Sequence, residues 1–189
     1  MVATDGFLRP NEELAAAGTL LRKGFPETYD TPALVAFLDA LRSGRPGSVP
    51  VYSHATYDIV PGAMRRIEGA DVVMLEGVNA LRPELAERLD LRLFVDADEP
   101  VVRQWYVERF LGLVDLAEHD AGSFYRRFVD LDRAGRRAMA VVVWEGVNLV
   151  NLTDHILATR DAADVVVRKS ADHTMVLIEG RGQNGRMPQ

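Results

Sequence analysis

The stretch Asp71-Val72-Val73-Met74-Leu75-Glu76-Gly77 is a short apolar run that ends in an acid and a glycine. Such a run is typical of a strand that is buried on both faces of a parallel sheet. Leu91 to Val95 and Asp164 to Val167 have the same character, and Thr174 to Glu179 is compatible with a final strand. These runs define the expected sheet.

Helical patterns lie between these runs. They cover Pro83 to Leu89, Glu99 to about Leu116, and about Leu131 to Leu152. Strands that alternate with helices predict an α/β fold with a mostly parallel sheet, in which ligands bind beyond the carboxyl ends of the strands.

The N-terminal third is less regular. Val2 to Gly6 is expected to end a short strand in a turn, because a β-branched residue precedes an Asp-Gly pair. Asn11 is a plausible N-cap for a helix to about Leu21, and Thr31-Pro32 opens a second helix that ends near Ser43. Arg45 to Pro50 is expected to be a turn, and Val51 to Asp58 to be extended.

Composition narrows the class of protein. The 189 residues are 48% hydrophobic and 26% charged, which favours a single domain, here expected over residues 1–179 with a flexible polar tail at 180–189. The net charge of −6 carries no basic block, so nucleic acid is not an expected partner. The chain has no cysteine, no apolar run as long as a membrane span and no secretory pattern, so a cytoplasmic protein without a membrane partner is expected.

Two acids stand where strands end. Asp5 lies where the first short strand becomes a loop, although an Asp before Gly is more often simple turn chemistry. Glu76 resembles the acidic strand end that holds Mg²⁺ or its water in phosphoryl transfer, and a carboxylate that only caps the next loop is an equal alternative.

Several polar residues lie in apolar surroundings. His54 is flanked by aromatic residues, and a structural histidine is the commoner case. Tyr106 and Arg109 share a helix face that could grip an anion, or Arg109 is merely solvated. Asn148 and Asn151 form another i, i+3 pair, whose amides need partners in the protein or in a ligand.

Longer strings carry a family resemblance. They are Thr4-Asp5-Gly6-Phe7-Leu8, Lys23 to Asp30, Pro50 to His54, Leu75 to Asn79, Trp105-Tyr106-x-x-Arg109-Phe110-Leu111, Asn148-x-x-Asn151-Leu152, Ile156-Leu157-x-Thr159-Arg160 and Lys169-Ser170-Ala171-x-His173. In this order and spacing they resemble type I pantothenate kinase, from about Thr4 to His173.

The resemblance implies a P-loop kinase fold and ATP-dependent phosphorylation of pantothenate, the first step of coenzyme A biosynthesis. It implies that Asp5 orients or accepts the hydroxyl proton and that Arg109 stabilises the transferring phosphoryl group. It further implies that pantothenate is bound by Tyr52, His54, Tyr106 and Asn148. Glu76 would lie near Mg²⁺, and His173 and Lys169 would lie beside the nucleotide.

The sequence also departs from the family. The family's first strand and Gly-rich loop lie upstream of the Asp-Gly-Phe motif, and these 189 residues contain no Gly-Lys pair. The resemblance therefore predicts an incomplete ATP site, a chain that is inactive by itself, and no ladder between Val72–Leu75 and Leu91–Val95. Arg126 and Arg127 stand where less basic residues are expected, and an aromatic side chain is lost near Leu113.

Two other functions stay open. The chain could be a non-catalytic module that binds pantothenate or coenzyme A, the latter being the family's expected inhibitor. It could also be a kinase of the uridine kinase and phosphoribulokinase type, which shares the fold. Association into a homo-oligomer is a further expectation, because unpaired strand edges invite pairing with another chain.

Overall fold

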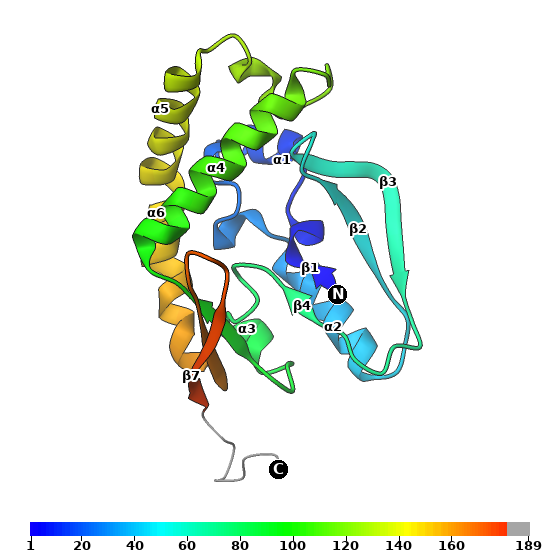
Figure 1. Cartoon of the computed structure of the whole chain (residues 1–189). Coiled ribbons are helices and arrows are strands. Elements are labelled where there is room, and N and C mark those ends of the chain that lie inside the picture. The colour runs from blue at the N-terminus through cyan, green and yellow to red at the C-terminus, as the bar shows by residue number, and fades with distance from the viewer. Residues whose placement is uncertain (181–189) are drawn as a thin grey trace.

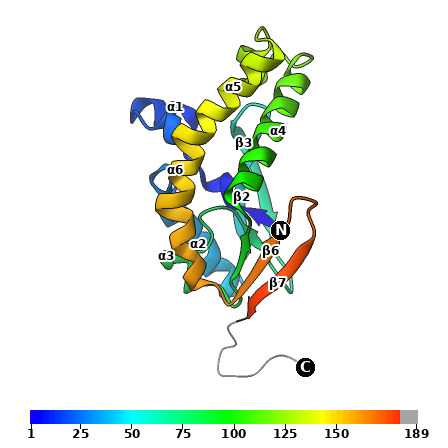
Figure 2. The same cartoon turned by 60° about the vertical axis from the view of Figure 1, so that its left-hand side comes forward.

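The structure is a computed structural model and describes residues 1–180. Figure 1 shows two parts side by side, with the N-terminal strands and short helices on the right and a long helical pair above a small sheet on the left. Figure 2 shows the long helices running up from this small sheet. The candidate site residues Asp5, His54 and Arg109 lie where the two parts meet.

The strands form three small sheets within residues 1–180. In the N-terminal part, β1 (Val2–Ala3) pairs in parallel with β4 (Leu75–Glu76). There too, β2 (Gly47–Ser53) and β3 (Asp58–Ile67) form an antiparallel hairpin. In the other part, β5 (Leu93–Asp96) is parallel to β6 (Val165–Lys169), which pairs antiparallel with β7 (Met175–Gly180). The α/β class is confirmed, but the expected sheet is divided.

The strand expected at Asp71–Glu76 is mostly wrong. Only Leu75 and Glu76 form a ladder, and the side chains of Val72 and Met74 are 84% and 62% exposed. Burial on both faces would need sheet neighbours on both sides, whereas β4 pairs with β1 alone within the described residues. The prediction that this segment forms no ladder with the Leu91–Val95 region is confirmed, because β5 pairs with β6.

The helices follow the sequence more closely. The α-helices are α1 (Asn11–Ala16), α2 (Thr31–Arg42), α3 (Pro83–Ala86), α4 (Glu99–Ala117), α5 (Arg133–Val143) and α6 (Leu149–Asn151). Asp30 caps α2 by accepting from the backbone N–H of Ala33, and Asp132 caps α5 by accepting from Gly135. Asn11 is the first residue of α1 and not its cap.

The long helix expected over Leu131–Leu152 exists but is irregular. Trp144–Asn148 and Leu152–Ile156 are π-helical turns on either side of α6, and Leu157–Ala162 continues as a 3₁₀ helix. Each π turn inserts extra backbone, so it changes which side chains face the neighbouring part.

The β2–β3 hairpin was only partly foreseen. The expected turn at Arg45–Pro50 is wrong, because β2 already begins at Gly47 and includes Pro50. Proline is tolerated there because the ladder register shifts between Pro50 and Tyr52. The strand β3 was not predicted at all.

Three buried clusters hold the fold. One lies in the N-terminal part around Phe7, Leu34 and Phe37, one around Phe94 and Val166, and one between α4 and α5 around Phe110. No helix among residues 1–180 is long and apolar enough to cross a membrane. Of the expected tail at 180–189, Gly180 ends β7 and the rest lies outside the described residues.

We predict an acid-sensitive contribution from Asp164. Its carboxylate accepts from the Arg92 guanidinium at 2.6 and 3.0 Å and from the Arg92 backbone N–H at 2.9 Å, and these bonds hold its pKa below the usual range. A lowered carboxyl pKa stabilises the fold above about pH 4, and this stabilisation is lost as the pH falls through the folded-state pKa.

The variant Asp164→Asn should therefore lower the free energy of unfolding by about 1–2 kcal/mol at pH 7. The difference from wild type should shrink below about pH 4, as measured by urea unfolding. Asp90→Asn is the control, because Asp90 is 90% exposed beside Arg42 and should change stability by less than about 1 kcal/mol. Equal effects of both variants would contradict the prediction.

We also predict that Gly77 is irreplaceable. Its φ of 147° favours glycine, and a Cβ there would lie 1.8 Å from Oγ1 of the fully buried Thr4. Gly77→Ala should cost on the order of 2 kcal/mol or more. Gly112→Ala, in the open middle of α4, should instead stabilise by about 0.5–1 kcal/mol. Thermal unfolding of the two variants measures both signs.

Candidate active site

Asp5, His54 and Arg109 form a row across the junction of the two parts. Asp5 lies in the 3₁₀ turn after β1, His54 in the β2–β3 connection and Arg109 on α4. His54 Nε2 is 3.9 Å from Asp5 Oδ2, and Arg109 Nη2 is 3.5 Å from His54 Nδ1. Residues 104 positions apart in sequence are thus bridged by one imidazole ring.

The neighbours of His54 in this row determine which nitrogen of its neutral imidazole carries the proton. Arginine can only donate, so a neutral His54 would accept at Nδ1 and carry its proton on Nε2. That proton faces Asp5. The row can therefore hold a proton next to a carboxylate, with a guanidinium at its far end.

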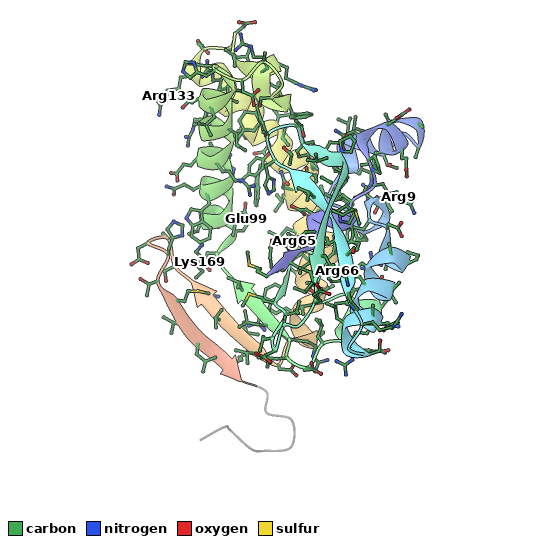
Figure 3. The ribbon with its side chains drawn as sticks, turned by 90° about the vertical axis from the view of Figure 1, so that its right-hand side faces the viewer. Arg9, Arg65, Arg66, Glu99, Arg133 and Lys169 are labelled. Atoms are coloured by element: carbon green, nitrogen blue, oxygen red, sulfur yellow. The ribbon has the colours of Figure 1, made fainter. Side chains whose placement is uncertain are left out.

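A cleft of about 210 Å³ opens beside Asp5 and His54. Tyr52 also lines it, together with the backbone of Val49–Val51 and Arg65. Figure 3 shows Arg65 on β3, and its guanidinium donates to the Met1 carbonyl at 2.8 Å. Three of the nine residues with expected roles thus share one cleft.

An aromatic group continues from the cleft to the helical part. The Tyr52 ring contacts His54 and Tyr57 edge-on at 5.1 and 6.4 Å, and Tyr57 packs on Phe124 at 4.6 Å. Burial raises the pKa of Tyr57 to about 12, so its hydroxyl stays protonated at neutral pH.

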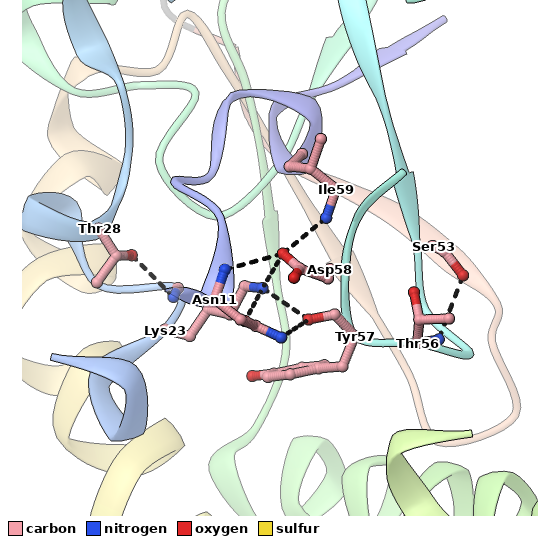
Figure 4. A network of polar contacts seen from close by, with 9 residues as sticks. Asn11, Lys23, Thr28, Ser53, Thr56, Tyr57, Asp58 and Ile59 are labelled. Carbon is pink, nitrogen blue, oxygen red and sulfur yellow. Dashed lines mark hydrogen bonds and ion pairs between the residues drawn. The ribbon is translucent and has the colours of Figure 1, made fainter. Parts of the chain in front are cut away.

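Lys23 lies beneath these rings and is the principal site-region residue that sequence reasoning missed. Figure 4 shows its ammonium donating to Asn11 Oδ1 and to the Tyr57 carbonyl, at 2.6 and 2.7 Å. Asp58 Oδ1 is 3.6 Å away, and the ammonium lies 5.0 and 4.8 Å from the Tyr52 and Tyr57 ring centroids. The side chain is 1% exposed.

Burial lowers the pKa of Lys23, and the attraction of Asp58 offsets part of this effect. The available signal in the sequence was its rarity, because only Lys23 and Lys169 are lysines while every other basic chain is arginine. A compact ammonium suits three closely spaced oxygens better than a planar guanidinium does.

Tyr106 and Asn148 meet on the helical side. A hydrogen bond from the Asn148 side chain favours the ionised form of Tyr106, but burial is the larger effect and raises the Tyr106 pKa to about 12. Trp144 packs on Tyr106 at 5.7 Å. Arg109 follows Tyr106 by nearly one helical turn on the same face of α4, and of these residues it is Arg109 that contacts His54.

The next asparagine has another partner. The Asn151 amide donates to the Gly24 carbonyl at 3.0 Å, and Asn79 donates to the same oxygen at 3.1 Å. The Asn151 Nδ2 group therefore has a backbone partner across the junction within the protein.

Glu76 lies at the end of β4, paired in register with Ala3. Its exposed side chain stands on the strand next to the one that leads to Asp5. Magnesium is commonly bound by one or two carboxylates together with water and substrate phosphates. Glu76 could serve as one such carboxylate, and residues 1–180 contain no group of three or more metal-binding side chains.

His173 and Lys169 form a separate group around Trp105. His173 stacks on the Trp105 ring with centroids 4.9 Å apart, and the Lys169 ammonium is 4.7 Å from the same ring. Figure 3 shows Lys169 at the β6–β7 hairpin. Among the described residues this group shares no hydrogen bond, ion pair or ring contact with Asp5 or His54, so it is a second, distinct part of the expected site.

The two unexpected arginines both have partners within the protein. Arg126 donates to the carbonyls of Ala117 and Glu118 and so caps the end of α4. Arg127 lies on the Phe124 ring, with its guanidinium carbon 4.0 Å from the centroid. Leu113 is half-buried on α4.

Comparison with known proteins places these residues in a family. A model of the phosphoribulokinase / uridine kinase family matches residues 11–111, more than half of the chain. Pantothenate kinase of Rhodopseudomonas palustris strain HaA2 is 44% identical over an alignment that covers 93% of this chain and 59% of that protein. Pantothenate kinase of Bradyrhizobium sp. strain ORS 278 is 43% identical over 92% of this chain and 58% of that protein.

The chain thus spans a little under three fifths of the length of these relatives. Among solved structures, a presumed fructose transport system kinase from Silicibacter sp. TM1040 is similar with a TM-score of 0.55 and 27% identity, over 74% of this chain and 68% of that one. Phosphoribulokinase from Rhodobacter spheroides shares the fold, with a TM-score of 0.51 and 13% identity over 89% of this chain and 59% of that one. The fold is therefore that of the P-loop kinases, and the chain belongs to the phosphoribulokinase / uridine kinase family.

Proposed function

We propose that this chain acts in the ATP-dependent phosphorylation of pantothenate to 4′-phosphopantothenate, and that it carries the side of the site that holds the acceptor. The Asp5–His54–Arg109 row supports this proposal best, because it joins a proton acceptor to a cation that can face a phosphoryl group. The similarity to pantothenate kinases supports pantothenate as the acceptor.

Each group of the row has a defined task in the proposal. Asp5 orients the primary hydroxyl of pantothenate and takes its proton. His54, Tyr52, Tyr106 and Asn148 bind the rest of pantothenate, for which two protonated tyrosines and an amide offer donors. Arg109 stabilises charge on the phosphoryl group as it moves.

The nucleotide and its metal have proposed positions. MgATP, when bound, supplies the phosphoryl group. Glu76 would lie near Mg²⁺, and His173 with Lys169 would lie beside the base, while the 189 residues contain no Gly-Lys loop for the phosphates. Coenzyme A contains the pantothenate unit and would compete for the same residues.

We expect pantothenate to bind this chain at one site, as measured by isothermal titration calorimetry. Loss of one hydrogen bond in Asn148→Ala should weaken binding up to about tenfold. Uridine and ribulose 5-phosphate serve as controls for the other substrates of the fold and should give no heat.

The accompanying turnover assay with MgATP has two informative results. Formation of 4′-phosphopantothenate that is lost in Asp5→Asn identifies a kinase, whereas binding without turnover identifies a pantothenate-binding module. Binding of uridine in place of pantothenate would contradict the proposed substrate.

We expect Arg109→Ala to lower kcat by on the order of 10²-fold, because the developing charge on the phosphoryl group loses its cation. Initial rates at saturating substrates test this in the chain, or in a longer protein that includes a Gly-rich phosphate loop if these 189 residues alone show no turnover. Arg103→Ala is the matched control on the same helix, since Arg103 pairs with Glu145 at 3.5 Å. An unchanged kcat in Arg109→Ala would refute the role.

A further inference from the structure

Asn151 is a buried amide that uses only half of its hydrogen-bonding capacity. It is 7% exposed, and its Nδ2 donates to the Gly24 carbonyl at 3.0 Å. Its buried Oδ1 finds no hydrogen-bond partner among the described residues. A buried acceptor without a partner costs free energy, so this side chain is not there for stability alone.

The Gly24 carbonyl does not depend on Asn151. It also accepts from Asn79 Nδ2 at 3.1 Å, and Asn79 belongs to the same N-terminal part as Gly24. If Asn151 were replaced by an apolar side chain, this carbonyl would keep one donor and the unpaired Oδ1 would disappear. What would be lost is the bond between the N-terminal part and the helix.

The helix at Asn151 has an unusual path. The π-helical turns Trp144–Asn148 and Leu152–Ile156 flank it on both sides, and Asn148 is three residues before it. Asn148 contacts Tyr106, and Trp144 packs on the same tyrosine. The direction in which this helix presents Asn148 therefore depends on where Asn151 is anchored.

The anchor itself is rigid. Gly24 has a φ of 99°, its N–H donates to Thr28 Oγ1 at 3.0 Å, and the adjoining Lys23 is fixed to Tyr57. Phe25, next along the chain, is 1% exposed and meets His155 edge-on at 5.7 Å. The Gly24 carbonyl is thus held in place where it meets residues 144–156. It lies next to Lys23, which contacts Tyr52 and Tyr57.

We propose that Asn151 is a positioning residue, which holds residues 144–156 to the Gly24 carbonyl so that Asn148 stays against Tyr106, on the helix that brings Arg109 to His54. This inference rests on the proposed function only for the identity of the ligand. Asn151 touches no substrate in this role and acts through Asn148 and Tyr106.

The test compares Asn151→Leu with the matched control Asn79→Leu, which removes the other donor to the same carbonyl but leaves the helix tied. Asn151→Leu should raise the Kd of pantothenate about tenfold or more. It should also speed amide hydrogen exchange in residues 144–156, while the unfolding temperature stays within about 3 °C of wild type. Asn79→Leu should leave exchange in residues 144–156 unchanged.

The outcomes separate the two proposals. If wild type binds no pantothenate, the proposed function fails, while exchange in residues 144–156 still decides the role of Asn151. Unchanged exchange in Asn151→Leu would overturn the positioning role. Asn151→Ser, which is too short to reach Gly24, guards against a packing defect of leucine; failure of both variants to fold would show a structural role and also overturn the inference.

Discussion

The buried ammonium of Lys23 is the constraint on which the N-terminal part of the site depends. An ammonium removed from water must be given oxygen atoms, and here they come from Asn11, Tyr57 and Asp58. These oxygens belong to α1, to the β2–β3 connection and to the first residue of β3, so the charge can be satisfied only when these segments converge on it. Tyr57 meets this demand in a left-handed conformation with a φ of 57°. The loop that carries His54 is held by the same contacts.

The neighbouring Gly24 carbonyl extends this constraint to the other part. It accepts from Asn79 and Asn151, one donor from each side of the junction. The site is divided in the same way, since Asp5 and His54 come from loops of one part and Tyr106, Arg109 and Asn148 from helices of the other. The junction thus brings a carboxylate of one part and a guanidinium of the other to the two nitrogens of one imidazole.

Local signals made the helices and the candidate residues predictable. Asp30 before Thr31-Pro32 and Asp132 before α5 are side-chain caps that act over three residues, so sequence alone contains them. The residues of the row were identified by motif and resemblance, and the structure brings Asp5, His54 and Arg109 together. The partners of Lys23 and Asn151 could not be predicted from the sequence, because they lie up to 127 positions away along the chain.

The strands show the opposite limit. An apolar run indicates that a strand is suited to a buried position in a sheet, but it does not show which strands pair with it. Leu93 and Val95 lie in a strand, as expected, yet their side chains are 47% and 48% exposed. Val72 was expected in a strand but lies outside β4. Burial of a strand depends on both of its flanking strands, and that information is nonlocal. The location of β5 is therefore predictable from the sequence pattern. That β4 and β5 do not pair with each other was predictable only from the family resemblance.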